Sequence, residues 1–478
     1  MPRVNINSVC RMKRIARAVL LGFILCLPGV FAPVAADAEK PTAWSTDVIG
    51  VSEEQLSPEY WLGRLHDAGQ PLMDQGAIAG FNRNLLADDP NMTDLSQFPA
   101  QLPGAEVRLM IESISKPASA GLHNGAGKAL DEAGYREYAG DLALEDIPDP
   151  VTVQFALVVR RSAMRAWPTL DRWYKAGENT NLDRFQENAL FPGDAVAVLH
   201  SSKDGEWSFV RSYNYAAWVR SDNLAIGERA VVENYRAAEP FLVITGSKVF
   251  TNANPEVPAL SELQLDMGIR LPLADPATVG NDRYGQNPFF SHAVLLPVRS
   301  AEGGLEIKPA LIARSSDVSR GYIPYTRENV IRQAFKFLGE RYGWGHSRNA
   351  RDCTGFVMEV YKTFGFLMPR NTGQQGKGEY GVNIRFTPGT DREQKLQALR
   401  QMDIGDLVYV PGHVLMHIGV VDGNPWVIHD VSLFRYIDAS GEYYEGTLNG
   451  VSVTPLIPLW GSRESPYVDQ VYDIKKIR

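Results

Sequence analysis

The last third of the chain changes from a helical pattern of apolar residues to a strand pattern. Behind Thr326, apolar residues recur with helical spacing over 330–338 and again over 356–364, which predicts two helices that each bury one face. Beyond residue 400 the pattern is typical of short strands, at 407–410, 416–421 and 426–431. We therefore expect an α+β domain over residues 319–478.

Short apolar runs separated by Gly- and Pro-bearing turns fill the middle of the chain, which predicts mostly β-structure. We expect strands at 153–159, 195–199, 207–211, 217–219, 241–245, 293–298 and 307–312. They are divided between two small β-barrels, 146–228 and 229–318. Neither region gathers titratable residues, so packing or recognition is the expected role of both.

The region before the strands is expected to be helical over 39–145. Ser57 is a good N-cap, and Pro58 suits the first position of a helix. Residues 1–38 instead have the pattern of a secretory signal, in which basic residues precede an apolar run over 18–27 and then small residues.

That apolar run is too short to cross a bilayer, which needs about 20 apolar residues. We expect cleavage near residues 36–38, a periplasmic or secreted product, and no transmembrane anchor after cleavage.

Length and charge narrow the possibilities. At 478 residues the chain has room for roughly three or four domains. Its 48 basic and 56 acidic residues give a formal net charge of −8, which offers no excess of positive charge to a phosphate backbone. Nucleic acid is therefore not an expected partner, and we expect a monomer.

Cys353 is the one cysteine that would remain after removal of residues 1–38. Unpaired thiols are unusual in oxidising compartments. Cys353 precedes a predicted helix, and the first turn of a helix favours a thiolate and lowers the thiol pKa. We expect a reactive nucleophile, and the alternative is a buried cysteine that acts as a small apolar residue.

A cysteine nucleophile needs a base within hydrogen-bond reach and a third group that orients the base. Four of the eight histidines share the domain of Cys353: His346, His413, His417 and His429. His417 and His429 lie on adjacent predicted strands, and strand parity lets their rings meet only if the connection is odd in length or bulged. We predict that odd connection. His413 competes for the role, but Pro411-Gly412 before it favours a loop.

Metal and cofactor motifs are not found. The sequence has no His-Glu-x-x-His motif, paired-cysteine spacing, Gly-x-Gly-x-x-Gly or phosphate-loop pattern. We therefore expect chemistry without a cofactor or a metal.

The motifs of the C-terminal domain resemble, in order, those of the NlpC-type (NlpC/p60 superfamily) cell-wall cysteine peptidases. They are Tyr342-Gly343-Trp344-Gly345, Asp352-Cys353-Thr354-Gly355-Phe356, Met368-Pro369-Arg370-Asn371, Gly405-Asp406-Leu407-Val408, His417-Ile418-Gly419-Val420 and Ile428-His429. The twelve-residue gap from His417 to His429 matches the family pattern. Upstream, 161–168 and 215–218 resemble bacterial SH3-like modules, and 77–82 resembles the N-terminal helical segment of a secreted branch.

The resemblance implies a papain-like fold for 319–478, with Cys353 as nucleophile, His417 as general base and then acid, and His429 as the residue that orients His417. It implies hydrolysis of peptidoglycan stem peptides or muropeptides between γ-D-glutamate and a diamino acid such as diaminopimelate. The backbone N–H of Cys353, with Tyr342 as a side-chain donor, would stabilise the oxyanion.

The resemblance also implies a pocket for the free amine of an N-terminal L-alanine. Asp352 and Tyr215 fit that pocket, although Asp352 could equally cap a helix and Tyr215 could be a barrel-surface aromatic. We add Trp344 to the substrate-binding residues, and Arg370 as a partner for a substrate carboxylate. Such a pocket excludes stems still attached to glycan, so the barrels would restrict access to short, freed peptides.

Two positions depart from the family pattern. His346 stands where many members have glycine, and Thr354 replaces a common serine. Two other functions remain open: a cell-wall binding protein whose peptidase domain is catalytically idle, or an acyltransferase that uses the same cysteine.

Overall fold

The computed structural model describes residues 46–177, 180–438 and 440–478. The predicted signal sequence and its cleavage site lie outside the described residues. Within those ranges, no helix has both the length and the apolar composition that crossing a bilayer requires.

The segment before the β-regions is helical, as predicted. Its helices are η1 (Glu53–Leu56), α1 (Pro58–Leu62), α2 (Gln75–Asp88), η2 (Leu95–Gln97), α3 (Gly104–Ile114), α4 (Glu132–Asp141) and η3 (Leu144–Asp146). Ser57 caps α1 by accepting a hydrogen bond from Glu59 N at 3.2 Å. Three short strands join this segment to later parts of the chain: β1 (Pro71–Met73) pairs with β20 (Tyr325–Thr326), β2 (Gln101–Leu102) with β4 (Val151–Thr152), and β3 (Leu122–His123) with β7 (Tyr174–Lys175).

The first β-region, which we call the first β-module (154–227), is one continuous sheet with the strand order β12-β5-β9-β10-β11-β6-β8. Its strands are β5 (Gln154–Val158), β6 (Ser162–Arg165), β8 (Gln186–Leu190), β9 (Ala195–Ser201), β10 (Trp207–Arg211), β11 (Ala216–Arg220) and β12 (Leu224–Gly227), with η4 (Ser221–Asn223) before the last. All four strands predicted here are present, because each carries an apolar run that the sheet buries.

The second β-region, the second β-module (241–320), consists of three small sheets around one apolar core. Helix α5 (Arg229–Ala237) precedes it. The strands are β13 (Phe241–Ile244), β14 (Lys248–Phe250), β15 (Gln264–Asp266), β16 (Arg270–Pro272), β17 (Ser291–Arg299), β18 (Leu305–Ala313) and β19 (Val318–Arg320), with η5 (Pro258–Leu260), α6 (Pro276–Val279) and η6 (Pro288–Phe290) between them. The three strands predicted here correspond to β13, β17 and β18, and the assignment of this region as a second SH3-like barrel stays a prediction.

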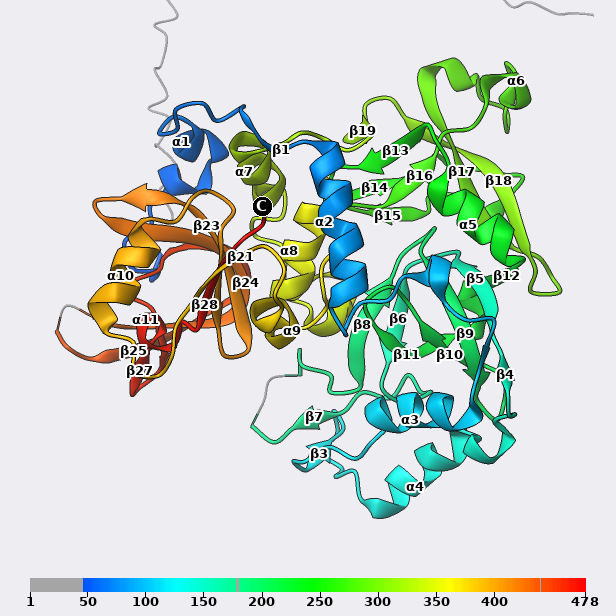
Figure 1. The fold of residues 1–478 in the computed structure, drawn as a ribbon, viewed down its shortest axis with the longest axis horizontal. Helices are drawn as coiled ribbons and strands as arrows, with labels where there is room; N and C mark the ends of the chain where they lie inside the picture. The colour runs from blue at the N-terminus through cyan, green and yellow to red at the C-terminus, as the bar shows by residue number, and fades with distance from the viewer. Residues whose placement is uncertain (1–45, 178–179, 439) are drawn as a thin grey trace, which may run out of the picture. The chain divides into compact units, whose positions relative to one another are not determined.

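The C-terminal domain is built on an antiparallel sheet with the order β21-β28-β22-β23-β24-β25 (Figure 1). Its strands are β21 (Val382–Arg385), β22 (Leu407–Val410), β23 (His413–Val421), β24 (Asn424–Ile437), β25 (Tyr443–Pro455) and β28 (Asp473–Lys476), with β26 (Trp460–Ser462) and β27 (Ser465–Pro466) as a separate pair. Its helices are α7 (Arg327–Phe335), η7 (Trp344–Asn349), α8 (Cys353–Lys362), α9 (Thr372–Lys377), α10 (Arg392–Arg400) and α11 (Tyr467–Gln470).

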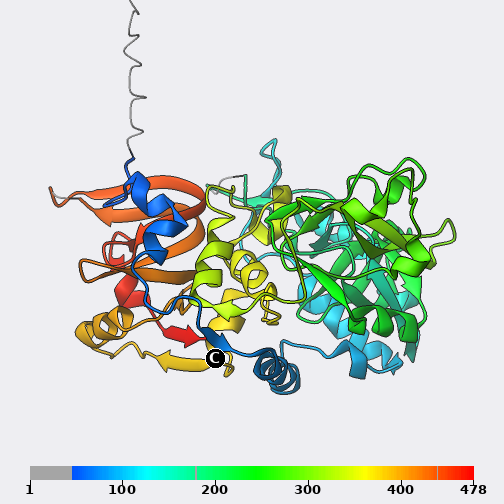
Figure 2. The same cartoon turned by 90° about the horizontal axis from the view of Figure 1, so that it is seen from above.

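The two faces of this sheet carry different cores because side chains alternate along a strand. Val414 and Met416 of β23 pack in one core with residues of α7 and α8, and Leu415 between them packs in another with residues of α10 and α11. The domain therefore has helices on both faces of the sheet, as Figures 1 and 2 show.

The N-terminal segment completes one of these cores. Trp61 of α1 is 1% exposed, and its ring lies 5.6 Å from that of Trp426, measured between ring centroids. A Cβ added at Gly419 would lie only 2.9 Å from the Trp61 ring, so glycine makes room for the indole. Sequence reasoning placed this apolar stripe in a core, and the core is that of the C-terminal domain.

We predict that Trp61→Ala lowers the stability of the C-terminal domain by about 3–5 kcal/mol, the usual cost of removing a buried Trp. The midpoint of urea unfolding, followed by fluorescence, measures this change. Leu109→Ala on α3 is the control, because Leu109 is 66% exposed and its loss should cost less than about 0.5 kcal/mol. A loss below about 1 kcal/mol for Trp61→Ala would contradict the shared core.

Candidate active site

Cys353 is the first residue of α8, the first-turn position that the sequence predicts. Asp352 is the N-cap, and its Oδ1 accepts a hydrogen bond from Gly355 N at 2.9 Å. The thiol is free, and the residue is 6% exposed.

The sulfur lies against two elements of the C-terminal domain. Its Sγ is 3.8 Å from Oγ1 of Thr372, at the start of α9, and it contacts the backbone N–H of Val414 near the start of β23. Burial, followed by the carboxylate of Asp352, raises the pKa of the Cys353 thiol to about 12. The expected low thiol pKa is therefore wrong for this structure, because loss of solvation outweighs the favourable helix terminus.

Two histidines meet on the neighbouring strands, but they are not the predicted pair. Nε2 of His413 lies 2.8 Å from Nδ1 of His429, and Nε2 of His429 lies 3.0 Å from Oγ1 of Thr454. His417 instead donates from Nδ1 to the carbonyl oxygen of Asp403 at 3.0 Å, and its Nε2 is buried without a partner. The predicted contact between His417 and His429 is wrong.

The register of the hairpin explains the difference. The turn is a two-residue one, Asp422-Gly423, with both residues at positive φ, so the loop itself is even in length and the predicted odd connection comes from a bulge in the strand. A bulge between His417 and Gly419 supplies the odd residue within the strand and leaves His417 opposite Val427. His429 lies two residues beyond Val427, so it sits diagonally between His413 and His417, and its ring contacts His413.

The position of the sulfur favours His413 over His417 as its partner. The sulfur contacts the amide of Val414, the residue next to His413. His417 is four residues along the extended strand from His413, which corresponds to about 13 Å. Among the described residues, no hydrogen bond joins the thiol directly to His413. No hydrogen bond between described residues uses Nδ1 of His413 either, so that nitrogen is free for another partner.

Burial lowers the pKa of His413 and of His417 to about 4, and that of His429 well below 6.5. All three rings are therefore neutral near pH 7. A neutral imidazole carries one acceptor nitrogen, which a general base requires.

Asp352 and Arg370 bind each other instead of facing open space. Arg370 is 2% exposed and donates to Asp352 Oδ2 at 2.6 Å, to Thr354 Oγ1 at 2.5 Å and to Asn188 Oδ1 at 2.6 Å. Asp352 Oδ2 also accepts from Gly345 N at 2.9 Å. Asp352 thus caps the helix, one of the two roles that the sequence allowed, and Arg370 holds its carboxylate in place.

Tyr215 comes from the first β-module and donates its hydroxyl to Oε2 of Glu187, a half-buried carboxylate that sequence reasoning missed. Burial is the main cause that raises the pKa of both groups. Tyr342 is 8% exposed beside Cys353, and burial keeps its hydroxyl protonated by raising its pKa well above 10. Trp344 packs on the first β-module and donates to Gln186 O at 3.0 Å.

Metal ligation is not indicated: within 46–177, 180–438 and 440–478, no three His, Cys, Asp or Glu side chains form a group that could hold an ion.

Comparison with known proteins finds two domain models that match parts of the chain. Residues 339–452 match the model of the NlpC/P60 family, and residues 168–220 match that of an SH3 domain of the SH3b1 type. Residues 339–452 form an NlpC/P60 domain. It contains Cys353, His413, His417 and His429, and the SH3 match lies within the first β-module.

Two curated relatives share a name. The γ-D-glutamyl-L-lysine dipeptidyl-peptidase of Bacillus cereus ATCC 10987 is 27% identical over 278 residues, which cover 54% of this chain and 71% of the relative. The enzyme of that name from Bacillus subtilis strain 168 is 31% identical over 118 residues, 24% of this chain and 35% of the relative.

A solved structure shares the fold over most of the chain. The NlpC/P60 endopeptidase from Photobacterium damselae subsp. piscicida superposes with a TM-score of 0.69 at 14% identity, covering 87% of this chain and 96% of that one. The family consists of cysteine-peptidase-type hydrolases that act on peptidoglycan, and action outside the cytoplasm fits that class.

The sequence around His413 indicates that this residue begins a strand, although sequence reasoning favoured a loop there. Pro411-Gly412 is a two-residue turn, and Val410 pairs with His413 across it, so β23 begins at His413. A tight turn between two apolar runs predicts strands that reach the turn on both sides. The NlpC/P60 domain therefore presents His413 at a strand end, beside the residue that touches the sulfur.

We predict that alkylation of Cys353 by iodoacetamide in the folded protein keeps rising with pH through pH 9, because burial and Asp352 raise the thiol pKa to about 12. Mass spectrometry of the peptide that contains Cys353, over pH 6–10, measures the rate. The same protein in urea is the control, in which the thiol should titrate near about 8.5. A plateau below pH 7 in the folded protein would show a preformed thiolate and contradict the prediction.

Proposed function

We propose that this protein is a cysteine endopeptidase that hydrolyses peptidoglycan stem peptides between γ-D-glutamate and an L-diamino acid. The observation that carries the proposal is the His413–His429 hydrogen bond of 2.8 Å, at the end of the strand whose Val414 amide contacts the Cys353 sulfur. The names of the two Bacillus relatives support the choice of bond.

In this mechanism His413, and not His417, is the general base. If Nε2–H of His429 donates to Thr454, then Nδ1 of His429 accepts from Nε2–H of His413. That tautomer leaves a lone pair on Nδ1 of His413 for the thiol proton. In this proposal His429 orients His413, where we expected it to orient His417, and Thr454 is its further hydrogen-bond partner.

The reaction proceeds by acyl transfer through Cys353. His413 takes the thiol proton as the sulfur attacks the γ-glutamyl carbonyl carbon, and the S–C bond forms with negative charge on the carbonyl oxygen. The N–H of Cys353 and the hydroxyl of Tyr342 stabilise that oxyanion. The C–N bond then breaks, and His413 gives its proton to the leaving amine.

Hydrolysis restores the enzyme. Water attacks the thioester carbon while His413 accepts a proton from it, the C–S bond breaks, and the sulfur regains its proton from His413. The product is the free γ-carboxylate. Because the resting thiol is neutral, proton transfer to His413 accompanies the attack and does not precede it.

We further propose that the substrate is a freed muropeptide with an N-terminal L-alanine. Its ammonium would bind the Glu187–Tyr215 pair, because the oxygens of Asp352 are already occupied by internal donors. The first β-module lies against the segment that leads to α9, where Asn214 donates to Met368 O at 3.1 Å. It therefore narrows the approach to Cys353, and a periplasmic or secreted location gives access to such peptides.

We predict that His413→Ala lowers kcat by at least about 100-fold, the usual contribution of a general base, and that Cys353→Ala abolishes turnover. His417→Gln is the matched control, because glutamine keeps a donor for the Asp403 carbonyl, and its kcat should stay within about threefold of wild type. The measurement is release of diaminopimelate from L-Ala-γ-D-Glu-diaminopimelate. Loss of activity in His417→Gln with an active His413→Ala would reverse the assignment.

We also predict that the free tripeptide is cleaved faster than intact sacculi, and that Glu187→Gln raises KM for the tripeptide about tenfold. An N-acetylated tripeptide is the control substrate, since it lacks the ammonium and should respond little to Glu187→Gln. Faster solubilisation of sacculi would reject the specificity for freed peptides. Turnover of neither substrate would favour a binding protein, and transfer of the acyl group to an added amine in preference to water would favour an acyltransferase.

A further inference from the structure

The loop that leads to the nucleophile is held in a costly conformation. Residues 345–349 contain four residues in the left-handed region: Gly345, His346, Arg348 and Asn349, with φ between 56° and 63°. For residues other than glycine this conformation costs about 1–2 kcal/mol each. Contacts outside the loop must therefore stabilise it.

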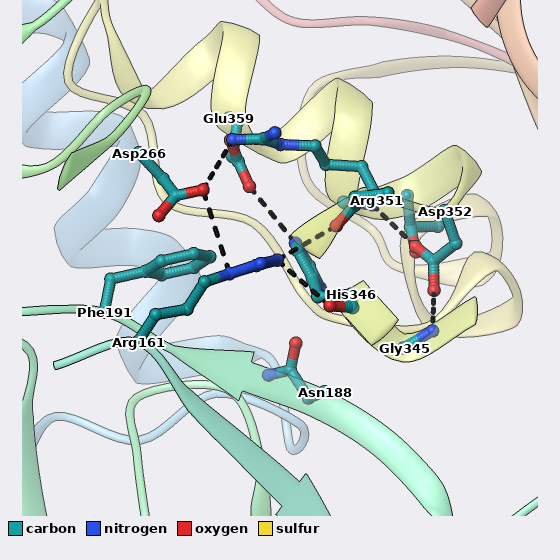
Figure 3. Close-up of polar contacts among 12 residues, drawn as sticks. Arg161, Asn188, Phe191, Asp266, Gly345, His346, Arg351, Asp352 and Glu359 are labelled. Atoms are coloured by element: carbon teal, nitrogen blue, oxygen red, sulfur yellow. Dashed lines mark hydrogen bonds and ion pairs between the residues drawn. The ribbon is translucent and has the colours of Figure 1, made fainter. Parts of the chain in front are cut away.

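The first β-module supplies one set of contacts, through Arg161. Its guanidinium donates to the carbonyl oxygens of His346 and Ala350, both at 3.0 Å, and to Asn349 Oδ1 at 2.7 Å (Figure 3). Gln186 of β8 adds a bond from its Nε2 to Gly345 O at 2.7 Å. A planar guanidinium suits this role because it can bond several oxygens at once.

The second β-module supplies the other set, through Asp266. This carboxylate is fully buried; its Oδ1 accepts from Arg351 at 2.8 Å and lies 3.8 Å from Nε of Arg161. Arg351, 1% exposed, also donates to Glu359 Oε2 at 2.8 Å. Half-buried Arg161 and buried Arg351 thus face the buried carboxylates of Asp266 and Glu359 (Figure 3).

His346 transmits these contacts to the nucleophile helix. Its Nε2 lies 3.2 Å from Glu359 Oε1 on α8, and a Cβ added at Gly355 would come within 2.6 Å of its ring. Burial, together with the charges of Arg370 and Arg161, lowers its pKa well below 6.5, so the ring is neutral. The residue that departs from the family pattern is therefore buried against α8.

We propose that Arg161 and Asp266 are positioning residues that hold Cys353 in its reactive place from the two β-modules. The expected effect on kcat rests on the proposed function. Arg161 bonds the loop backbone, Asp266 orients Arg351, and both act on the turn that ends at Asp352 and Cys353. The β-modules are then parts of the catalytic apparatus, in addition to any effect on access.

The test compares Arg161→Met with Arg160→Met, a control in the same connection whose side chain is 55% exposed. We expect Arg161→Met to lower kcat at least tenfold with KM within threefold, because small displacements of a nucleophile cost large factors in rate. Hydrogen exchange of residues 344–356 should rise, while that of 407–421 should not change. Arg161→Lys keeps the positive charge but lacks the planar guanidinium that bonds several oxygens at once, so it should recover part of kcat.

Unchanged exchange in 344–356 would overturn the contact network as the support of the loop. Raised exchange with unchanged kcat would overturn the positioning role. If Arg161→Met does not fold, the same two measurements, kcat and hydrogen exchange of residues 344–356, are made on Arg161→Lys and Asp266→Asn and test the positioning role. If the wild-type protein cleaves no stem peptide, the proposed function fails, and the exchange comparison still decides whether Arg161 holds the loop.

Discussion

The cap of α8 by Asp352 is the interaction on which the site depends. Asp352 accepts hydrogen bonds from Gly355 and Gly345 of the backbone and from the side chains of Thr354 and Arg370. Four donors around one buried carboxylate hold it ionised, and attraction to Arg370 keeps its pKa well below 3.8 against the cost of burial. The direction of the first turn, and with it the position of Cys353, follows from that carboxylate.

This arrangement carries an electrostatic cost for the nucleophile. The negative charge that caps the helix stands one residue from the sulfur and raises the thiol pKa. The group that caps the helix therefore disfavours the thiolate. Formation of the thiolate then depends on the partner that accepts the thiol proton. A buried neutral imidazole, oriented by a second imidazole, is suited to take it.

The sequence predicted the α+β class, most strands and the first-turn cysteine, because these follow from local periodicity and capping. It failed where the outcome depends on register. A single bulge after His417 brings His429 onto the face that carries His413 and His417, diagonally between the two, and apolar alternation does not show which of them it meets. It also missed Glu187 and Thr454, because no local sequence pattern marks either residue. Each has a place in the site only through a hydrogen bond to a residue far along the chain.

The indole of Trp61, seated on the glycine of that bulge, links the start of the described chain to its catalytic sheet. The C-terminal domain does not contain all of its own core. Any exchange of catalytic domains between relatives would have to carry the helix around residues 58–62 along with the sheet, and the two segments would have to evolve together. The boundary drawn by sequence similarity is thus narrower than the unit that folds.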